Sequence, residues 1–281
     1  MAFTTGYKNF IPTLWSARLL SHLDNALVAL QLVNRDYEGE ITAFGDTVKI
    51  NQIGNVTIKD YTGNDIDAPE ELDSTQLSLV IDQAKYFNFA VKDIAKAQAN
   101  VNLMDAAMAR AGYGMASVVD TDIFSEIAAQ AANRVGTTAK ATEVDVANAY
   151  DLIVDLGVTL DEKNVPREGR KLVLPAWYLG LLSKDARFTR NFEILANGVV
   201  DGAIVGGFQL LMSNNLKKET GGVVHSVGGT TQGMTFANQV VETEAYRPEK
   251  NFSDAVKGLN VWGRKAVQPN CLVDFIIKPK A

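Results

Sequence analysis

The sequence predicts an α+β protein in which one long helix and an extended β excursion are attached to a compact α/β unit. Apolar residues recur at steps of three and four between residues 94 and 118, and alternate with polar residues between 45 and 88. Both patterns occur within residues 142–235. Because 47% of the 281 residues are hydrophobic and 21% are charged, the chain has the balance of a folded protein and can bury a core.

An amphipathic helix is expected from Thr13 to about Leu32, after an apolar and aromatic lead. Thr13 can cap its first turn, and the apolar positions repeat at three and four residues. These positions are Leu14, Trp15, Leu19, Leu20, Leu23, Leu27 and Leu30. An N-terminal tail of this kind needs something to hold it down, so we expect it to contact a neighbouring surface.

Residues 45–88 are predicted to form a long β ribbon with two arms. Apolar and polar residues alternate on both sides of Gly54-Asn55, and the apolar ones are Val48, Ile50, Val56 and Ile58. An acidic stretch containing a proline follows near the predicted tip, and TQLSLVIDQAKYFNFAV supplies the second arm. Such a ribbon is marginal alone in water and needs a surface to lie on.

A single long helix is predicted to begin at Ile94. Its apolar positions advance by alternating three and four residues up to Val118, which keeps one helical face apolar. At a rise of about 1.5 Å per residue, it would run on the order of 40 Å. We expect Asp120 and Asp122, which follow, to cap the start of a new helix. The alternative, a Mg²⁺ site, lacks further acidic residues nearby in the sequence.

Residues 142–235 are predicted to form the compact α/β unit. An amphipathic helix is expected over 142–160, and strands are expected over 171–174 and 208–213. The glycine-rich stretch 221–229 lacks the Lys-Ser/Thr ending of a phosphate-binding loop and is expected to be a flexible surface loop.

Residues 236–281 are expected to form a returning sheet. Strand-like pieces at 240–245 and 271–277 alternate with Gly and Pro turns. Because these pieces cannot make a large sheet by themselves, we expect them to pack back under the long helix.

The sequence predicts no enzyme and no cofactor. It contains two histidines, His22 and His225, and no metal-binding spacing stands out. VHSVGG around Ser226 partly matches the nucleophile elbow of hydrolases, but Val224 replaces the first glycine and no histidine follows the serine. A hydrolase centred on Ser226 is therefore kept as an alternative, which a Ser226→Ala variant would test.

Charge and hydropathy exclude two further classes of partner. The net charge is −6, the pI is about 5.1, and Lys and Arg are scattered, so no nucleic-acid-binding stripe is apparent. No apolar stretch reaches the roughly eighteen residues of a membrane span, and no secretory signal is visible. The lone Cys271 cannot form an internal disulfide, which fits a reducing cytoplasm.

Seven runs of sequence, spread over most of the chain, carry a resemblance to a known family. They are LWSARLL at 14–20, VNRDYEGEI at 33–41, GDTVKINQIGNVTIKDY at 45–61, KYFNFAVKDIAKAQA at 85–99, DAAMARAGYGMASVVDTDI at 105–123, VPREGRKLVLPAWYLGLLSKDARF at 165–188 and GGFQLLMSNNL at 206–216. In these runs and their order the chain resembles the major capsid proteins of tailed bacteriophages with the Hong Kong ninety-seven type of fold.

The resemblance implies a division of the chain into the parts of that fold. These parts are an N-arm over 1–44, an E-loop over 45–88, the spine helix of the P-domain over 89–141, an A-domain over 142–235 and a returning P-domain sheet over 236–281. Candidate subunit contacts, each of which can instead be ordinary core, are Trp15, Leu19, Ile53, Val56, Tyr61, Arg187 and Phe188.

The resemblance also implies a function in assembly. Such a chain forms pentamers and hexamers that close into an icosahedral shell around the genome of a tailed double-stranded DNA phage. Its partners would be copies of itself, together with scaffolding, portal and decoration proteins and packaged DNA held without specific recognition, and no membrane. We expect it in the virion capsid, after assembly in the host bacterial cytoplasm. The alternative with the same fold is an encapsulin-like nanocompartment shell, which co-purified cargo would reveal. One relative forms covalent Lys–Asn cross-links between subunits, but the sequence does not indicate which Lys and Asn of this chain would correspond to them.

Overall fold

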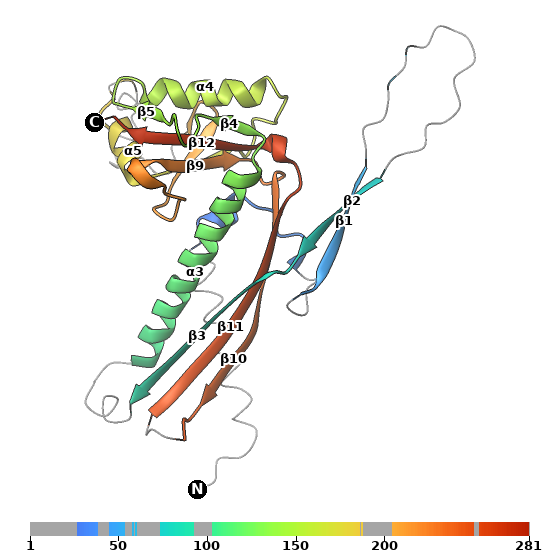
Figure 1. Cartoon of the computed structure of the whole chain (residues 1–281), viewed down its shortest axis with the longest axis vertical. Coiled ribbons are helices and arrows are strands. Elements are labelled where there is room, and N and C mark those ends of the chain that lie inside the picture. Colours follow the sequence, from blue (N-terminus) through green and yellow to red (C-terminus); the bar gives the residue numbers. More distant parts are fainter. Residues whose placement is uncertain are drawn as a thin grey trace.

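The computed structural model describes residues 27–38, 45–53, 58, 60, 74–92, 103–185, 187, 204–249 and 253–280. These parts form an elongated molecule (Figure 1). A compact α/β unit lies at one end, and the long helix α3 (Leu103–Gln130) descends from it beside a narrow sheet. A hairpin of β1 (Thr47–Ile53) and β2 (Ser74–Val80) projects from the side of that sheet.

The narrow sheet has three antiparallel strands in the order β10-β11-β3 within the described part of the chain. They are β3 (Gln83–Lys92), β10 (Met234–Tyr246) and β11 (Ser253–Ala266). Alternate residues of each strand face α3: Phe87 and Phe89 stack at 5.9 Å between ring centroids and pack with Val256 and Met108. The strand-like piece expected at 240–245 lies in β10, in the sheet beside the long helix.

Helix α3 continues beyond the end predicted for it at Val118 and runs to Gln130. The expectation that Asp120 and Asp122 begin a new helix is wrong, because both lie inside α3. Asp120 instead accepts hydrogen bonds from the backbone N–H groups of Ala29 (3.0 Å) and Val28 (3.3 Å), at the start of the short 3-10 helix η1 (Ala29–Gln31). It therefore caps a different segment of the chain.

The hairpin β1–β2 pairs in continuous antiparallel register, from Thr47 opposite Val80 to Ile53 opposite Ser74. Two details of the predicted ribbon are wrong. The residues after Gln83 belong to the three-stranded sheet through β3, and Ile58, expected in a strand, lies outside the strands and is 95% exposed. The cause is that the two parts of the expected second arm pair with different strands, β2 with β1 and β3 with β11.

The α/β unit contains a sheet in the order β4-β12-β9-β6-β8-β7, with β5 also paired to β12. Its strands are β4 (Asn133–Val135), β5 (Thr142–Val144), β6 (Lys171–Leu174), β7 (Ile204–Val205), β8 (Phe208–Met212), β9 (Val224–Gly229) and β12 (Leu272–Pro279). The helices are α4 (Ala149–Asp161) and α5 (Ala176–Leu182), with short 3-10 turns η3 (Thr220–Gly222) and η4 (Pro269–Cys271). Strands β6 and β8 appear where they were predicted.

Three expectations for this unit are wrong. The helix expected over 142–160 begins only at Ala149, because the first residues form β5 beside β12. The expected surface loop at 221–229 contains the buried strand β9. Strand β12 contacts α3 as expected, but it belongs to the sheet of the α/β unit, where it pairs with β9 and β4, and not to the returning sheet. Segments that are far apart in the sequence therefore pair in this sheet.

Candidate assembly surfaces

The base of the β1–β2 hairpin rests on the face of the three-stranded sheet that points away from α3. Alternating apolar residues of the hairpin form its inner side, which packs on Ala237 and Val261 of the sheet. They are Val48, Ile50, Leu79 and Ile81. The residues between them, such as Lys49 and Ser78, point outwards and are exposed. The sheet thus fixes the direction in which the hairpin leaves the body (Figure 1).

Further along the same outer face, the sheet is not covered by the described part of the chain. Tyr86 on β3 is 75% exposed there. Beside it, Lys257 forms a 2.7 Å ion pair with Glu244, and the hydroxyl of Tyr246 donates a hydrogen bond to Asn88 at 3.1 Å. A shallow pocket of about 360 Å³ lies between these groups, lined by Tyr86, Asn88, Lys257, Gly258 and Leu259. This face combines aromatic, apolar and charged groups, as protein interfaces do.

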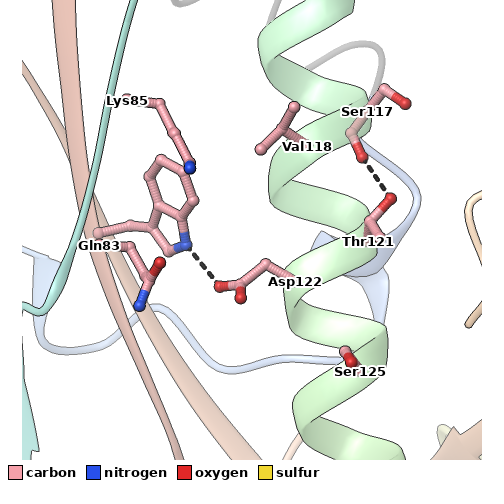
Figure 2. Close-up of a pocket in the computed structure, with 8 residues that line it drawn as sticks. Gln83, Lys85, Ser117, Val118, Thr121, Asp122 and Ser125 are labelled. Carbon is pink, nitrogen blue, oxygen red and sulfur yellow. Dashed lines mark hydrogen bonds between the residues drawn. The ribbon is translucent and has the colours of Figure 1, made fainter.

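A second crevice, of about 380 Å³, lies between α3 and the sheet (Figure 2). The helix contributes three hydroxyl side chains spaced four residues apart, Ser117, Thr121 and Ser125. Gln83 and Lys85 come from β3. The crevice therefore lies where α3 packs against the three-stranded sheet of the same chain, and hydroxyl, amide and ammonium groups line much of it.

Trp262 of β11, which is fully buried, also lines this crevice. Its indole N–H donates a 2.8 Å hydrogen bond to Asp122, as Figure 2 shows, and Asp122 also pairs with Arg264 at 2.7 Å. The carboxylate of Asp122 therefore fastens the helix to the sheet.

Arg187 is the one candidate contact residue whose side chain is described. Its guanidinium pairs with Asp185 at 2.9 Å and with Asp151 of α4 at 2.6 Å, and lies 4.9 Å from the ring centroid of Tyr150. The hydrogen bonds from Arg187 lower the pKa of Asp185. Arg187 thus ties its own α/β unit together, while its partly exposed guanidinium leaves the predicted subunit contact untested.

The contacts of the other six candidate subunit-contact residues are not described by the structure. Ile53 is the last residue of β1, but its side chain is not described. The remaining five lie outside the described residues, and they are Trp15, Leu19, Val56, Tyr61 and Phe188. Their roles in subunit contacts remain predictions.

Exposed apolar side chains on the α/β unit were not singled out from the sequence. Val158 of α4, Ile204 of β7 and Met212 of β8 are exposed. Gly157 and Gly206 bring α4 and β7 into close approach, since a Cβ added to Gly157 would lie 2.3 Å from the carbonyl oxygen of Gly206. Val158 interrupts the polar side of an otherwise amphipathic helix, and this break in the pattern could have indicated an exposed apolar residue from the sequence.

The candidate hydrolase centre is not assembled. Ser226 is fully buried and its hydroxyl donates a hydrogen bond to the carbonyl oxygen of Val173. His225 precedes it on the same strand, so the two side chains point to opposite faces of the sheet. His225 bonds Asp274 instead, at 3.0 Å. A buried serine with its hydroxyl already used cannot receive a substrate.

Two further kinds of site are absent from the described residues. No group of three or more His, Cys, Asp or Glu side chains is arranged there to hold a metal ion. Among the described helices, none combines the length and the apolar character that a membrane crossing requires.

Comparisons with known proteins agree with this geometry. Residues 75–275 match the model of a family described as phage capsid protein. A solved structure from Mycobacterium phage Che8 is similar, with 28% identity, a TM-score of 0.71, and coverage of 89% of this chain and 90% of that one. The capsid structure of cyanophage P-SCSP1u has 14% identity and a TM-score of 0.67, over 89% and 86% of the chains. No curated protein sequence matches.

A virus-like particle from Pyrococcus furiosus also has this fold, with 12% identity, a TM-score of 0.59, and coverage of 95% of this chain and 99% of that one. The fold and its open surfaces define a structural protein of capsid shells, of the Hong Kong ninety-seven type. The chain belongs to the phage capsid protein family. This family and fold comprise structural capsid proteins and not known enzymes.

Proposed function

We propose that this chain is the major capsid protein of a tailed double-stranded DNA phage, and that it assembles through pentamers and hexamers into an icosahedral shell around the genome. The observation that carries the proposal is the match to a phage structure at 28% identity over about nine-tenths of both chains. An encapsulin-like shell is not favoured, because the family model is that of phage capsids and the Pyrococcus particle shares only the fold, at 12% identity.

The physical basis of assembly is the set of surfaces that the described chain leaves open. The hairpin β1–β2 extends from the body, Tyr86 stands exposed on the outer face of the sheet, and Ile204 is 77% exposed at the edge of the α/β unit. Head-to-tail contacts between different patches generate rings. Each contact can be weak, because a subunit held at several places re-forms each contact at high effective concentration.

In this proposal the hairpin lies over an adjacent subunit, and the α/β units meet around the five-fold and six-fold axes. The N-terminal arm reaches a third surface. Scaffolding, portal and decoration proteins are further partners, and DNA is enclosed without specific recognition. The shell forms in the host cytoplasm, and the chain performs no catalysis.

The hairpin contact is tested by shortening the hairpin without disturbing its base. Ile53 and Ser74 are register partners, so replacing residues 54–73 by Asn-Gly should close β1 and β2 in a two-residue turn. The apolar side that packs on the sheet is kept. We expect a chain with the circular dichroism and thermal unfolding of the wild type that forms no closed particles in negative-stain electron microscopy.

The matched control changes the same hairpin without shortening it. Lys49 and Ser78 are register partners on its outward side, near the base. A Lys49→Ser, Ser78→Lys double variant keeps the length and the composition of the hairpin, and we expect it to form shells. Closed shells from the shortened chain, seen at wild-type yield, would contradict the proposed role of the hairpin.

A further inference from the structure

His225 lies buried between two carboxylates in the α/β unit. Its side chain, on β9, is 7% exposed, and Nδ1 lies 3.0 Å from Oδ1 of Asp274 on β12. Nδ1 is also 3.1 Å from the second oxygen of the same carboxylate. On the other side of the ring, Nε2 lies 3.4 Å from Oε1 of Glu219. The two nitrogens of one imidazole therefore face two different acidic side chains.

A neutral imidazole cannot satisfy both carboxylates, because it has one N–H donor and one lone pair. The close approach to both oxygens of Asp274 places the N–H on Nδ1 of His225. Nε2 then turns its lone pair towards Glu219, and this buried atom has no hydrogen-bond partner in the structure. A second proton would make Nε2 a donor, and the ring would then bond both acids.

Glu219 belongs to a surface segment, Lys217–Val223, that folds back onto β9. Two backbone hydrogen bonds hold this segment: His225 N–H donates to the carbonyl of Lys217 at 2.9 Å, and Glu219 N–H donates to that of Val223 at 2.8 Å. The residues that follow Glu219 in the segment, Thr220–Gly222, are exposed. The contact with His225 thus joins a surface segment to the buried sheet.

Lys217 and Arg134 are the other charged groups that act on the two carboxylates beside the His225 ring. Lys217 pairs with Glu219 at 3.2 Å and lowers its pKa by this hydrogen bond, with a smaller contribution from His225. Burial raises the pKa of Asp274, opposed by the charges of His225, Arg134 and Lys217. Arg134 comes from β4, where it is the register partner of Asp274. Glu219 therefore remains an anion that a protonated ring can bind.

We propose that His225 is a protonation-dependent clasp that holds the segment Lys217–Val223 against the β9–β12 strand pair. With both nitrogens protonated, the ring donates to Asp274 and Glu219 together and the segment is fastened. When Nε2 loses its proton, the Glu219 bond is lost and the segment is held by its backbone bonds alone. This inference concerns a device within one subunit and is independent of how subunits assemble.

Hydrogen exchange of the intact chain tests the clasp. Protection factors, corrected for the chemical exchange rate, are measured by mass spectrometry for peptides covering residues 217–225 at about pH 5.5 and about pH 7.5, a range in which histidine is the usual side chain to change its charge. We expect protection about tenfold higher at the acidic pH, the effect of one hydrogen bond between charged groups.

Two variants and one control make the exchange result specific. His225→Gln and Glu219→Gln should both remove the pH response, and Glu219→Gln does so without changing a core residue. Glu168→Gln, at an exposed glutamate elsewhere on the unit, should keep it. An unchanged protection factor in the wild type would overturn the clasp. So would a response that survives His225→Gln, since the titrating group would then be Asp274.

The position of the proton supplies a second readout. In the chain labelled with ¹⁵N-histidine, signals absent from the His225→Gln spectrum belong to His225. Their shifts report which nitrogen is protonated. We expect the Nδ1–H tautomer at the higher pH and the doubly protonated ring at the lower. A neutral ring with its proton on Nε2 would contradict the geometry on which the clasp depends.

Discussion

The α/β unit and the half of the molecule built from α3, the three-stranded sheet and the hairpin bury their side chains in different ways. In the α/β unit every residue of β12 from Leu272 to Ile277 is buried, so the strand is covered on both faces. In the other half, β3 alternates between Phe87, packed under α3, and Tyr86, 75% exposed on the opposite face. Among the described residues, strand β12 of the α/β unit is covered on both faces, whereas the three-stranded sheet has no layer over the face that carries Tyr86.

This difference separates the two tasks of a shell subunit. A sheet covered on both faces supplies a fold that does not depend on neighbours. A sheet with one open face, and a hairpin directed away from the body, leave apolar and aromatic surface that a neighbouring subunit can bury. Substitutions of buried residues in the first region should change folding, and substitutions on the open face of the three-stranded sheet should change assembly.

The largest effect is expected at the centre of the α/β unit. Phe275 is fully buried and meets Tyr178 edge-on at 6.3 Å between ring centroids, and the Tyr178 hydroxyl bonds the carbonyl of Ala149 at 2.9 Å. Phe275→Ala should lower the free energy of unfolding by about 3–5 kcal/mol, because it leaves a cavity in a core that cannot collapse.

Denaturant unfolding of the unassembled chain checks this prediction. Trp177, on α5, reports on the α/β unit, and Trp262 reports on the three-stranded sheet. The chain has a third tryptophan, Trp15. Keeping either Trp177 or Trp262, with the other and Trp15 replaced by Phe, separates the two signals. The α/β unit should unfold at a lower denaturant concentration in the variant. If only the Trp262 signal moved, the two halves would be coupled more strongly than we infer.

An intermediate effect is expected at Asp120 of α3, which binds the backbone of the N-terminal segment at Val28 and Ala29. Asp120→Ala removes the acceptor for two backbone N–H groups, those of Val28 and Ala29, and should cost about 1–2 kcal/mol. Asp120→Asn keeps an acceptor and should cost less. Thermal unfolding of the three chains under identical conditions measures both values, and equal costs would show that the charge matters more than the cap.

The same residue gives stability a pH dependence of known sign. Burial raises the pKa of Asp120, opposed by the hydrogen bonds from Ala29 and Val28. The folded chain therefore holds this proton more tightly than the unfolded chain, whose Asp titrates near 3.9. The resulting stabilisation is complete below that pH and is lost as the pH rises through the folded pKa. This decrease should be absent from Asp120→Asn, and its persistence there would assign it to another group.

The smallest effect on folding, and a large one on assembly, is expected at Tyr86. Because its side chain is exposed, Tyr86→Ala should change the free energy of unfolding of the unassembled chain by less than about 0.5 kcal/mol. It should reduce the yield of closed particles in electron microscopy, and Tyr86→Phe, which keeps the ring, should restore most of it. A clear loss of stability in the unassembled chain would place Tyr86 in its own fold and not in an interface.

Local patterns in the sequence were sufficient where the spacing of apolar residues alone marks a helix or a strand. The steps of three and four residues predicted α3, and the strands β6 and β8 were found at their predicted places. The alternation of Val48 and Ile50 correctly predicted a strand. These patterns succeed because a helix face or a strand face is set by neighbours a few residues away.

Prediction failed where a distant segment decides the outcome. VHSVGG was predicted as a loop because of its glycines, yet it lies buried between β12 and β6. A Cβ on Gly228 would lie 2.7 Å from the carbonyl oxygen of Lys171, so glycine permits close strand packing here and not flexibility. The exposed Tyr86 was likewise not singled out, since alternation alone does not tell which face α3 covers.

By itself the sequence determined the class of element at α3, β1, β6 and β8, and its runs of resemblance identified the capsid fold, which the comparisons confirm. Only the tertiary structure decided which strands share a sheet, that Asp120 caps a segment ninety-one residues away, and that His225 meets two acids. The physical reason is range: helix and strand periodicity are local, whereas sheet order, burial and the pairing of charges depend on contacts between residues far apart in the chain.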